Sequence, residues 1–74
     1  MKIEYSKDID ALYVYFREIP VAKTKEIEKG VLADLGADGH IVGIEILDAS
    51  QKLGQEDLSR LNIEHFPAQA APRY

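Results

Sequence analysis

The chain has 74 residues, no cysteine, and a formal net charge of −4 from nine basic and thirteen acidic residues. The lack of cysteine excludes disulfides, thiolate zinc sites and thiol catalysis. The basic residues are too scattered to form the basic face that most nucleic-acid binding requires, so we expect no nucleic-acid partner. No apolar run has the length of a signal peptide or a membrane span, and we therefore expect a cytoplasmic protein with no membrane partner.

The first half of the chain predicts three strands. Residues 2–5 alternate polar and apolar side chains, which is typical of a short strand. Residues 11–16 form a continuous β-branched and aromatic run that is largely apolar on both faces, as expected for an interior strand. Pro20 ends that region. Residues 21–29 are charged around a single Ile27, which is typical of an exposed edge strand.

The second half predicts a hairpin. Asp38 and Gly39 lie between two β-rich runs, residues 31–35 and residues 41–47, and an Asp-Gly pair in such a position is a strong hairpin signal. Gly30 before the first run indicates a turn or a bulge.

A helical region follows the hairpin. Asp48, as an N-cap acceptor with Gln51 at the third helical position, fits a capping box and predicts a helix start. Gly54 interrupts this region, whose apolar side is formed by Leu53, Leu58 and Leu61.

These elements together predict an α+β fold, a small antiparallel β-meander of four or five strands with a short C-terminal helical region on one face. We expect residues 1–66 to form one β-rich domain. We expect residues 67–74, which contain two prolines, to form an irregular C-terminal tail.

One short helical region covers only one side of such a sheet, so the other side is predicted to mediate self-association into a homodimer. The side chains expected on that interface are Tyr13, Tyr15, Ile41, Glu45 and Leu47. An unpaired buried carboxylate is costly, so Glu45 is expected to pair with Arg17 or with a lysine of the partner. A catalytic carboxylate with a raised pKa is the alternative interpretation of Glu45.

Metal binding is a second alternative. Its candidate ligands are oxygen-bearing side chains and one histidine that lie in or near predicted turns, namely Asp8, Asp10, Asp34, Asp38 and His40. Aspartate is also the residue type that accepts backbone hydrogen bonds in turns, and no calcium-loop spacing is present, so turn capping is the favoured interpretation. His40 and His65 lack the i, i+4 spacing of zinc motifs and are interpreted as an exposed loop histidine and a tail histidine.

Three blocks in fixed order resemble the small prokaryotic domain of unknown function family 2283. They are Asp8-x-Asp10-Ala11-Leu12-Tyr13-Val14, Gly30-Val31-x-x-Asp34, and Asp38-x-x-x-Val42-Gly43-Ile44-Glu45-Ile46-Leu47-x-Ala49-Ser50. The resemblance covers most of residues 1–53. It implies a compact β-rich fold with a C-terminal helix and no established activity, and members similar to this chain are often suspected of being the antidote half of toxin–antitoxin pairs.

The sequence thus favours a non-catalytic, homodimeric domain without a cofactor that acts through protein contacts. An antitoxin-like neutralisation of a basic protein encoded nearby is the finer form of this hypothesis, since the acidic surface attracts basic partners. The alternatives are a small metal-binding protein or metal-dependent enzyme that uses the turn aspartates, and a ligand sensor with a pocket between sheet and helix.

Overall fold

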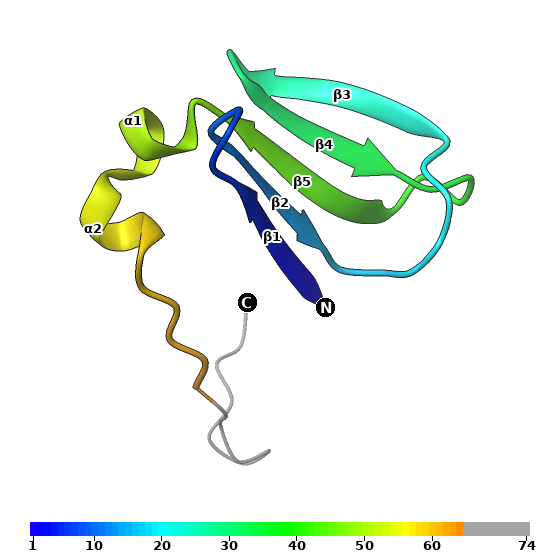
Figure 1. Ribbon diagram of the computed structural model, residues 1–74. Helices are drawn as coiled ribbons and strands as arrows, with labels where there is room; N and C mark the ends of the chain where they lie inside the picture. Colours follow the sequence, from blue (N-terminus) through cyan, green and yellow to red (C-terminus); the bar gives the residue numbers. More distant parts are fainter. Residues whose placement is uncertain (65–74) are drawn as a thin grey trace.

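The computed structural model describes residues 1–64, so His65 and the predicted irregular tail, residues 67–74, lie outside the described residues. The described part holds five strands and two short helices (Figure 1). Their bounds are β1 Lys2–Ser6, β2 Ala11–Tyr15, β3 Lys23–Glu28, β4 Val31–Leu35, β5 Ile41–Leu47, α1 Ala49–Leu53 and α2 Gln55–Leu58. The predicted small α+β domain with an antiparallel sheet is confirmed.

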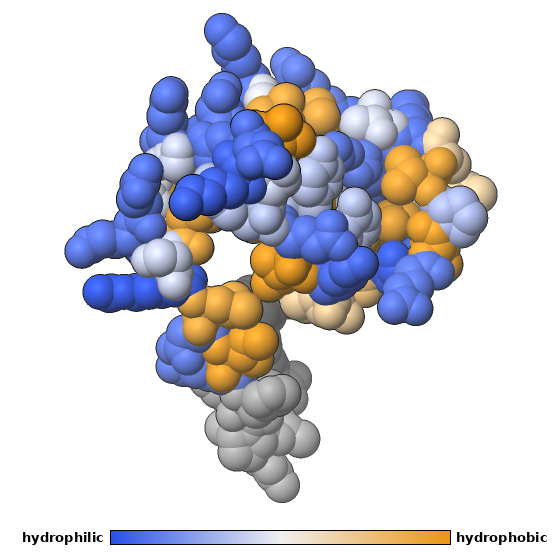
Figure 2. Space-filling view, viewed as in Figure 1, coloured by the Kyte–Doolittle hydropathy of each residue, from blue (hydrophilic) through white to orange (hydrophobic). Residues whose placement is uncertain are grey.

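The strand order, which the sequence left open, is β1-β2-β5-β4-β3, with every neighbouring pair antiparallel. The connection after β2 carries the chain to the opposite edge of the sheet, and β5 then fills the place between β2 and β4 (Figure 1). The β3 strand is an exposed edge along its whole length, as predicted, and Figure 2 shows hydrophilic side chains along this side of the molecule. Lysines and glutamates on an edge strand discourage pairing with another chain.

The predicted hairpin joins β4 to β5. Asp38 accepts a hydrogen bond from the His40 backbone N–H at 3.0 Å, and Gly39 adopts a positive φ of 81° that side-chain-bearing residues rarely reach. Gly43 in β5 has a different reason to lack a side chain, because a Cβ there would lie 2.6 Å from the backbone oxygen of Val14. The close approach of β2 and β5 therefore depends on this glycine.

A bulge interrupts the β4–β5 ladder. Asp34 lies opposite Gly43, whereas the next residue, Leu35, lies opposite Ile41, which leaves Val42 as the extra residue. The Val42 side chain is 1% exposed, and its backbone oxygen accepts two hydrogen bonds, from the N–H groups of residues 16 and 17 at 2.7 and 3.2 Å. The bulge thus also fixes the chain where it leaves β2.

The fully buried apolar side chains of the described residues are few and small, namely Ala11, Ala33, Val42 and Ala49. The reason is that the sheet forms a single layer, since Figure 1 shows α1 and α2 beyond the end of β5 and beside the β1–β2 hairpin. Within residues 1–64, neither helix has the length or the apolar character needed to span a bilayer.

The start of α1 is not capped by the predicted capping box, and that part of the prediction is wrong. Asp48 has a left-handed backbone with a φ of 51°, and its side chain makes no capping hydrogen bond. Asp10 from the β1–β2 turn takes its place: its carboxylate accepts hydrogen bonds from the Ser50 N–H at 3.0 Å and the Ser50 hydroxyl at 2.7 Å. The Tyr5 hydroxyl donates to the same carboxylate at 2.6 Å. These bonds, from Tyr5 first and Ser50 next, lower the pKa of Asp10.

Two glycine substitutions separate these roles, because Asp10 and Asp48 share the same left-handed backbone with a φ of 51°. We expect Asp10→Gly to lower Tm by about 5–10 °C, since it removes charge-assisted hydrogen bonds that join the turn to α1. Asp48→Gly is the matched control, and we expect it to leave Tm within about 3 °C of the wild type because glycine also relieves the left-handed strain. Thermal denaturation followed by circular dichroism measures both, and a larger loss in Asp48→Gly would restore the capping box.

Candidate functional site

The two faces of the sheet differ in chemistry. Residues that lie opposite each other in neighbouring strands share a face, and the face alternates along each strand. One face, which we call the apolar face, is therefore formed by Ile3, Tyr5, Leu12, Val14, Val31, Ala33, Ile44 and Ile46. Most of these side chains are only half-buried, and Ile3 and Tyr5 are each 41% exposed. The apolar face thus has the composition of a protein core without the burial of one.

The opposite face, which we call the tyrosine face, carries Tyr13 and Tyr15 beside polar groups. The two rings are stacked, with centroids 6.1 Å apart and planes 9° from parallel. Glu45 lies directly opposite Tyr13, and Leu47 follows on the same face. Four of the five residues predicted for the interface therefore share this face, but the bulge pairs Ile41 with Leu35 and separates it from them.

Two carboxyl groups meet on the tyrosine face. Asp34 is 5% exposed and accepts a hydrogen bond from the Thr24 hydroxyl at 2.7 Å. A hydrogen bond with Asp34, burial, and the charge of Asp34 together raise the pKa of Glu45 from 4.5 to about 7. Near neutral pH, Glu45 is therefore partly protonated, and the two carboxyls tend to share one negative charge.

The partner expected for Glu45 is engaged elsewhere. Arg17 Nη2 lies 2.8 Å from Asp38 Oδ2 in the β4–β5 hairpin, and this ion pair is at the surface. Hydrogen bonds from Arg17 and the His40 backbone lower the pKa of Asp38 to about 2. Glu45 instead shares its proton with Asp34, a pairing that depends on the register of β4 against β5.

The five candidate metal ligands do not converge. Asp10 binds Ser50, Asp34 binds Thr24, and Asp38 binds Arg17, so three of them belong to separate hydrogen-bonded groups. The other two, Asp8 and His40, are exposed in the β1–β2 turn and the β4–β5 hairpin. Within residues 1–64, no three histidine, aspartate or glutamate side chains gather closely enough to hold a metal ion. Backbone capping, as proposed for turn aspartates, accounts for Asp10 and Asp38.

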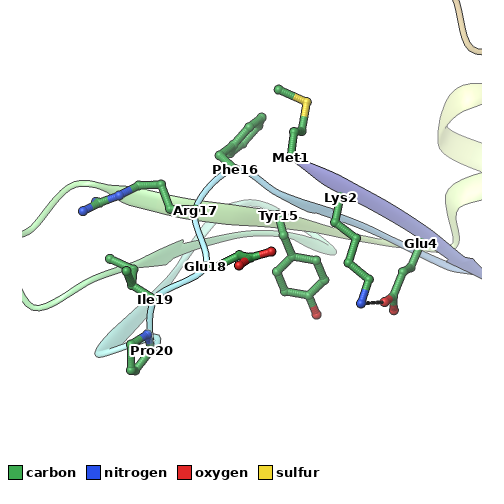
Figure 3. A pocket seen from close by; sticks show the side chains of 9 residues that line it. All are labelled: Met1, Lys2, Glu4, Tyr15, Phe16, Arg17, Glu18, Ile19 and Pro20. Atoms are coloured by element: carbon green, nitrogen blue, oxygen red, sulfur yellow. Dashed lines mark ion pairs between the residues drawn. The ribbon is translucent and has the colours of Figure 1, made fainter.

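A surface cavity of about 380 Å³ lies at the end of the sheet where β1 begins and β2 ends (Figure 3). Figure 3 shows Lys2 and Tyr15 on one side of the sheet and Met1 and Phe16 on the other. Lys2 Nζ lies 2.6 Å from Glu4 Oε1, so this cation is already paired. The polar groups around the cavity therefore do not converge on a common point.

Known proteins match this chain in two comparisons. The pattern of a family described as protein of unknown function (DUF2283) matches residues 2–50. A protein of Methanosarcina mazei with the provisional name hypoxanthine phosphoribosyltransferase is 35% identical over 69 residues, which cover 90% of this chain and 54% of the relative. The chain thus spans about half the length of that relative. No solved structure matches the chain.

The raised pKa of Glu45 predicts a stability change with pH. A carboxyl whose pKa is higher in the folded state than its ordinary 4.5 stabilises the fold below pH 4.5, and this contribution is lost as the pH rises through about 7. We therefore expect Glu45→Gln, which keeps a hydrogen-bond donor at every pH, to raise Tm at pH 8 and to match the wild type at pH 5. Thermal denaturation between pH 5 and pH 8 measures the difference.

Glu26→Gln is the control, since Glu26 is an exposed carboxyl on the same face, opposite Leu32. It is expected to keep the wild-type dependence of Tm on pH. A Glu45→Gln variant whose Tm falls in parallel with the wild type from pH 5 to pH 8 would disprove the shared proton.

Proposed function

Because the chain belongs to the DUF2283 family of proteins of unknown function, we propose a function from the geometry of its sheet: a homodimeric, non-catalytic domain that acts through protein contacts. In this proposal the apolar face joins two copies, and the tyrosine face contacts a basic partner protein. The observation that carries the proposal is the single-layer sheet with two unlike faces that α1 and α2 leave open.

The apolar face supports self-association. Fully burying a valine, leucine or isoleucine side chain contributes about 1.5–3 kcal/mol, so a face of several half-buried residues of this kind holds a large unused stabilisation. The largest fully buried side chain within residues 1–64 is Val42, and a core of this size is small for an independent domain. A second copy of the same face supplies the missing layer through an isologous contact.

The tyrosine face supports a partner of opposite charge. Its acidic side chains are Glu4, Glu26, Asp34 and Glu45, and its lysine, Lys2, is paired with Glu4. Stacked tyrosine rings beside carboxylates suit arginine and lysine side chains, which bind both groups. The net charge of −4 further attracts a basic protein, and neutralisation of such a partner is the antitoxin-like form of the proposal.

The homodimer is tested by light scattering at micromolar concentration, where we expect twice the mass of one chain. Val14 and Ile44 lie opposite each other on the apolar face, and both are half-buried. Val14→Thr with Ile44→Thr keeps the β-branched shapes that favour strands but buries two hydroxyls in each copy. We expect this pair to weaken the dimer at least about 100-fold.

Tyr13→Thr with Tyr15→Thr is the control on the other face and is expected to keep the wild-type dissociation constant. The reverse result, a dimer lost in the tyrosine variant and kept in the Val14 and Ile44 variant, would move the interface to the tyrosine face. A wild-type monomer at 100 µM would reject the homodimer.

The partner contact is tested by co-expression with the product of the adjacent gene and purification through a tag on this chain. We expect the two proteins to co-purify, and the complex to weaken as NaCl is raised, because surface charge attraction is screened by salt. The Tyr13→Thr and Tyr15→Thr variant should lose the partner while it remains dimeric. A neighbouring product that does not co-purify, or a complex indifferent to both salt and the tyrosines, would contradict this part of the proposal.

A further inference from the structure

The C-terminal segment from α1 to residue 64, which we call the arm, has an apolar side with little cover from its own chain. Its apolar residues are Leu53, Leu58, Leu61 and Ile63, and the last two are 67% and 66% exposed. Figure 2 shows apolar side chains gathered on the segment that follows α2, with open space between it and part of the sheet. The arm therefore carries apolar surface outward from the sheet.

The arm is fixed at its root and loosely placed beyond it. Its first residues are tied to the β1–β2 turn, where the Ala49 N–H donates to the Asp10 backbone oxygen at 2.9 Å beside the bonds of Ser50. Farther along, a cavity of about 300 Å³ lies between Tyr5 and α2 and is bordered by Leu58. The arm thus starts at one end of the apolar face but does not pack on it.

The size of the sheet gives a reason for the arm to take part in the dimer. Five strands spaced about 4.8 Å apart, with about five residues of 3.4 Å each, make a face of roughly 24 by 17 Å. Two such faces in contact cover about 800 Å² in total, whereas stable protein interfaces bury about 1,200–2,000 Å². The apolar faces alone therefore fall short, and additional surface has to come from another part of the chain.

The arm has the length and the charge to supply this surface. Residues 59–64, if extended, reach about 20 Å, which is close to the width of the sheet. Lys25 lies opposite Ala33 and thus at the β3 border of the apolar face, while Glu64 follows Ile63 on the arm. An arm that crosses the face brings opposite charges to the far edge.

We propose that each copy lays its arm across the apolar face of the other copy, so that Leu61 and Ile63 pack on the side chains around Ile44. This inference rests on the proposed homodimer and adds the segment that completes it. A second copy is the favoured occupant because α1 and α2 carry the arm off the end of its own sheet (Figure 1). An exchange of two arms covers both faces with one kind of contact.

The chain contains no cysteine, so a pair of introduced cysteines reports the contact without background. We would place both in one full-length chain, Ile44→Cys on the sheet and Leu61→Cys on the arm, oxidise it at 10 µM, and separate the products on a non-reducing gel. The expected product is a covalent dimer. An intramolecular disulfide, which runs as a single chain, would show that the arm closes on its own sheet and would overturn the inference.

A second variant keeps the test independent of disulfide geometry. Leu61→Ser with Ile63→Ser is expected to weaken the dimer at least about 100-fold in sedimentation velocity, since four apolar side chains leave the interface of two copies. Arg60→Ser with Asn62→Ser is the matched control from the same segment and should stay within about threefold of the wild type. A serine pair at Leu61 and Ile63 that dimerises like this control overturns the arm exchange but leaves the homodimer standing, whereas a monomeric wild type removes both.

Discussion

The covering of two open sheet faces is the constraint on which both the stability and the function of this domain depend. Ordering the backbone costs about 1–2 kcal/mol per residue, and this cost is offset chiefly by the burial of apolar surface. Three alanines and Val42 are a small set of fully buried apolar side chains against a cost of that size. The two faces also differ, since a row of valine and isoleucine gains from leaving water whereas a row of tyrosine and carboxylate remains well hydrated. That difference is the reason to assign self-association to the apolar face and partner contact to the other.

Asp10 connects the ends of this arrangement. Its carboxylate binds Tyr5, four residues after the chain begins, and Ser50, at the start of the arm. These contacts join residues 40 positions apart in the chain, and they set the direction in which the arm leaves the sheet. A carboxylate in a turn is thus a structural element here, and the interaction explains why an aspartate and a serine occur in two separate blocks of the family pattern.

The sequence predicted what depends on neighbouring residues and missed what depends on register. The strands, the Asp38-Gly39 hairpin, the charged edge and the interruption at Gly54 all follow from local alternation and turn chemistry, and all are present. The capping box failed because Asp48 is left-handed, a property set by the contact of α1 with the remote Asp10. Local propensity is silent about a cap supplied from 40 residues away.

The candidate site was predictable to the same extent. Alternation places Tyr13, Tyr15 and Glu45 on one face without knowledge of the strand order. Asp34 was treated as one of several turn aspartates, although an alignment of the two hairpin strands about Asp38-Gly39 brings it near Glu45. Ile41 was placed on the wrong side because the extra residue of a bulge leaves no signal in an unbroken apolar run.

The carboxyl pair links the tyrosine face to its proposed partner through protons. With the pKa of Glu45 at about 7, the pair holds close to one proton at neutral pH, so part of the acidic charge of the face is masked in the free protein. A guanidinium or ammonium group that arrives between Glu45 and the tyrosines favours the ionised carboxyl and displaces the proton. Binding to a basic partner is then tighter at pH 8 than at pH 6, whereas contacts of the apolar face, which contains no carboxyl group, are indifferent to that change. The same titration therefore distinguishes the two faces: a partner complex that responds to pH uses the tyrosine face, and a dimer that does not respond uses the apolar one.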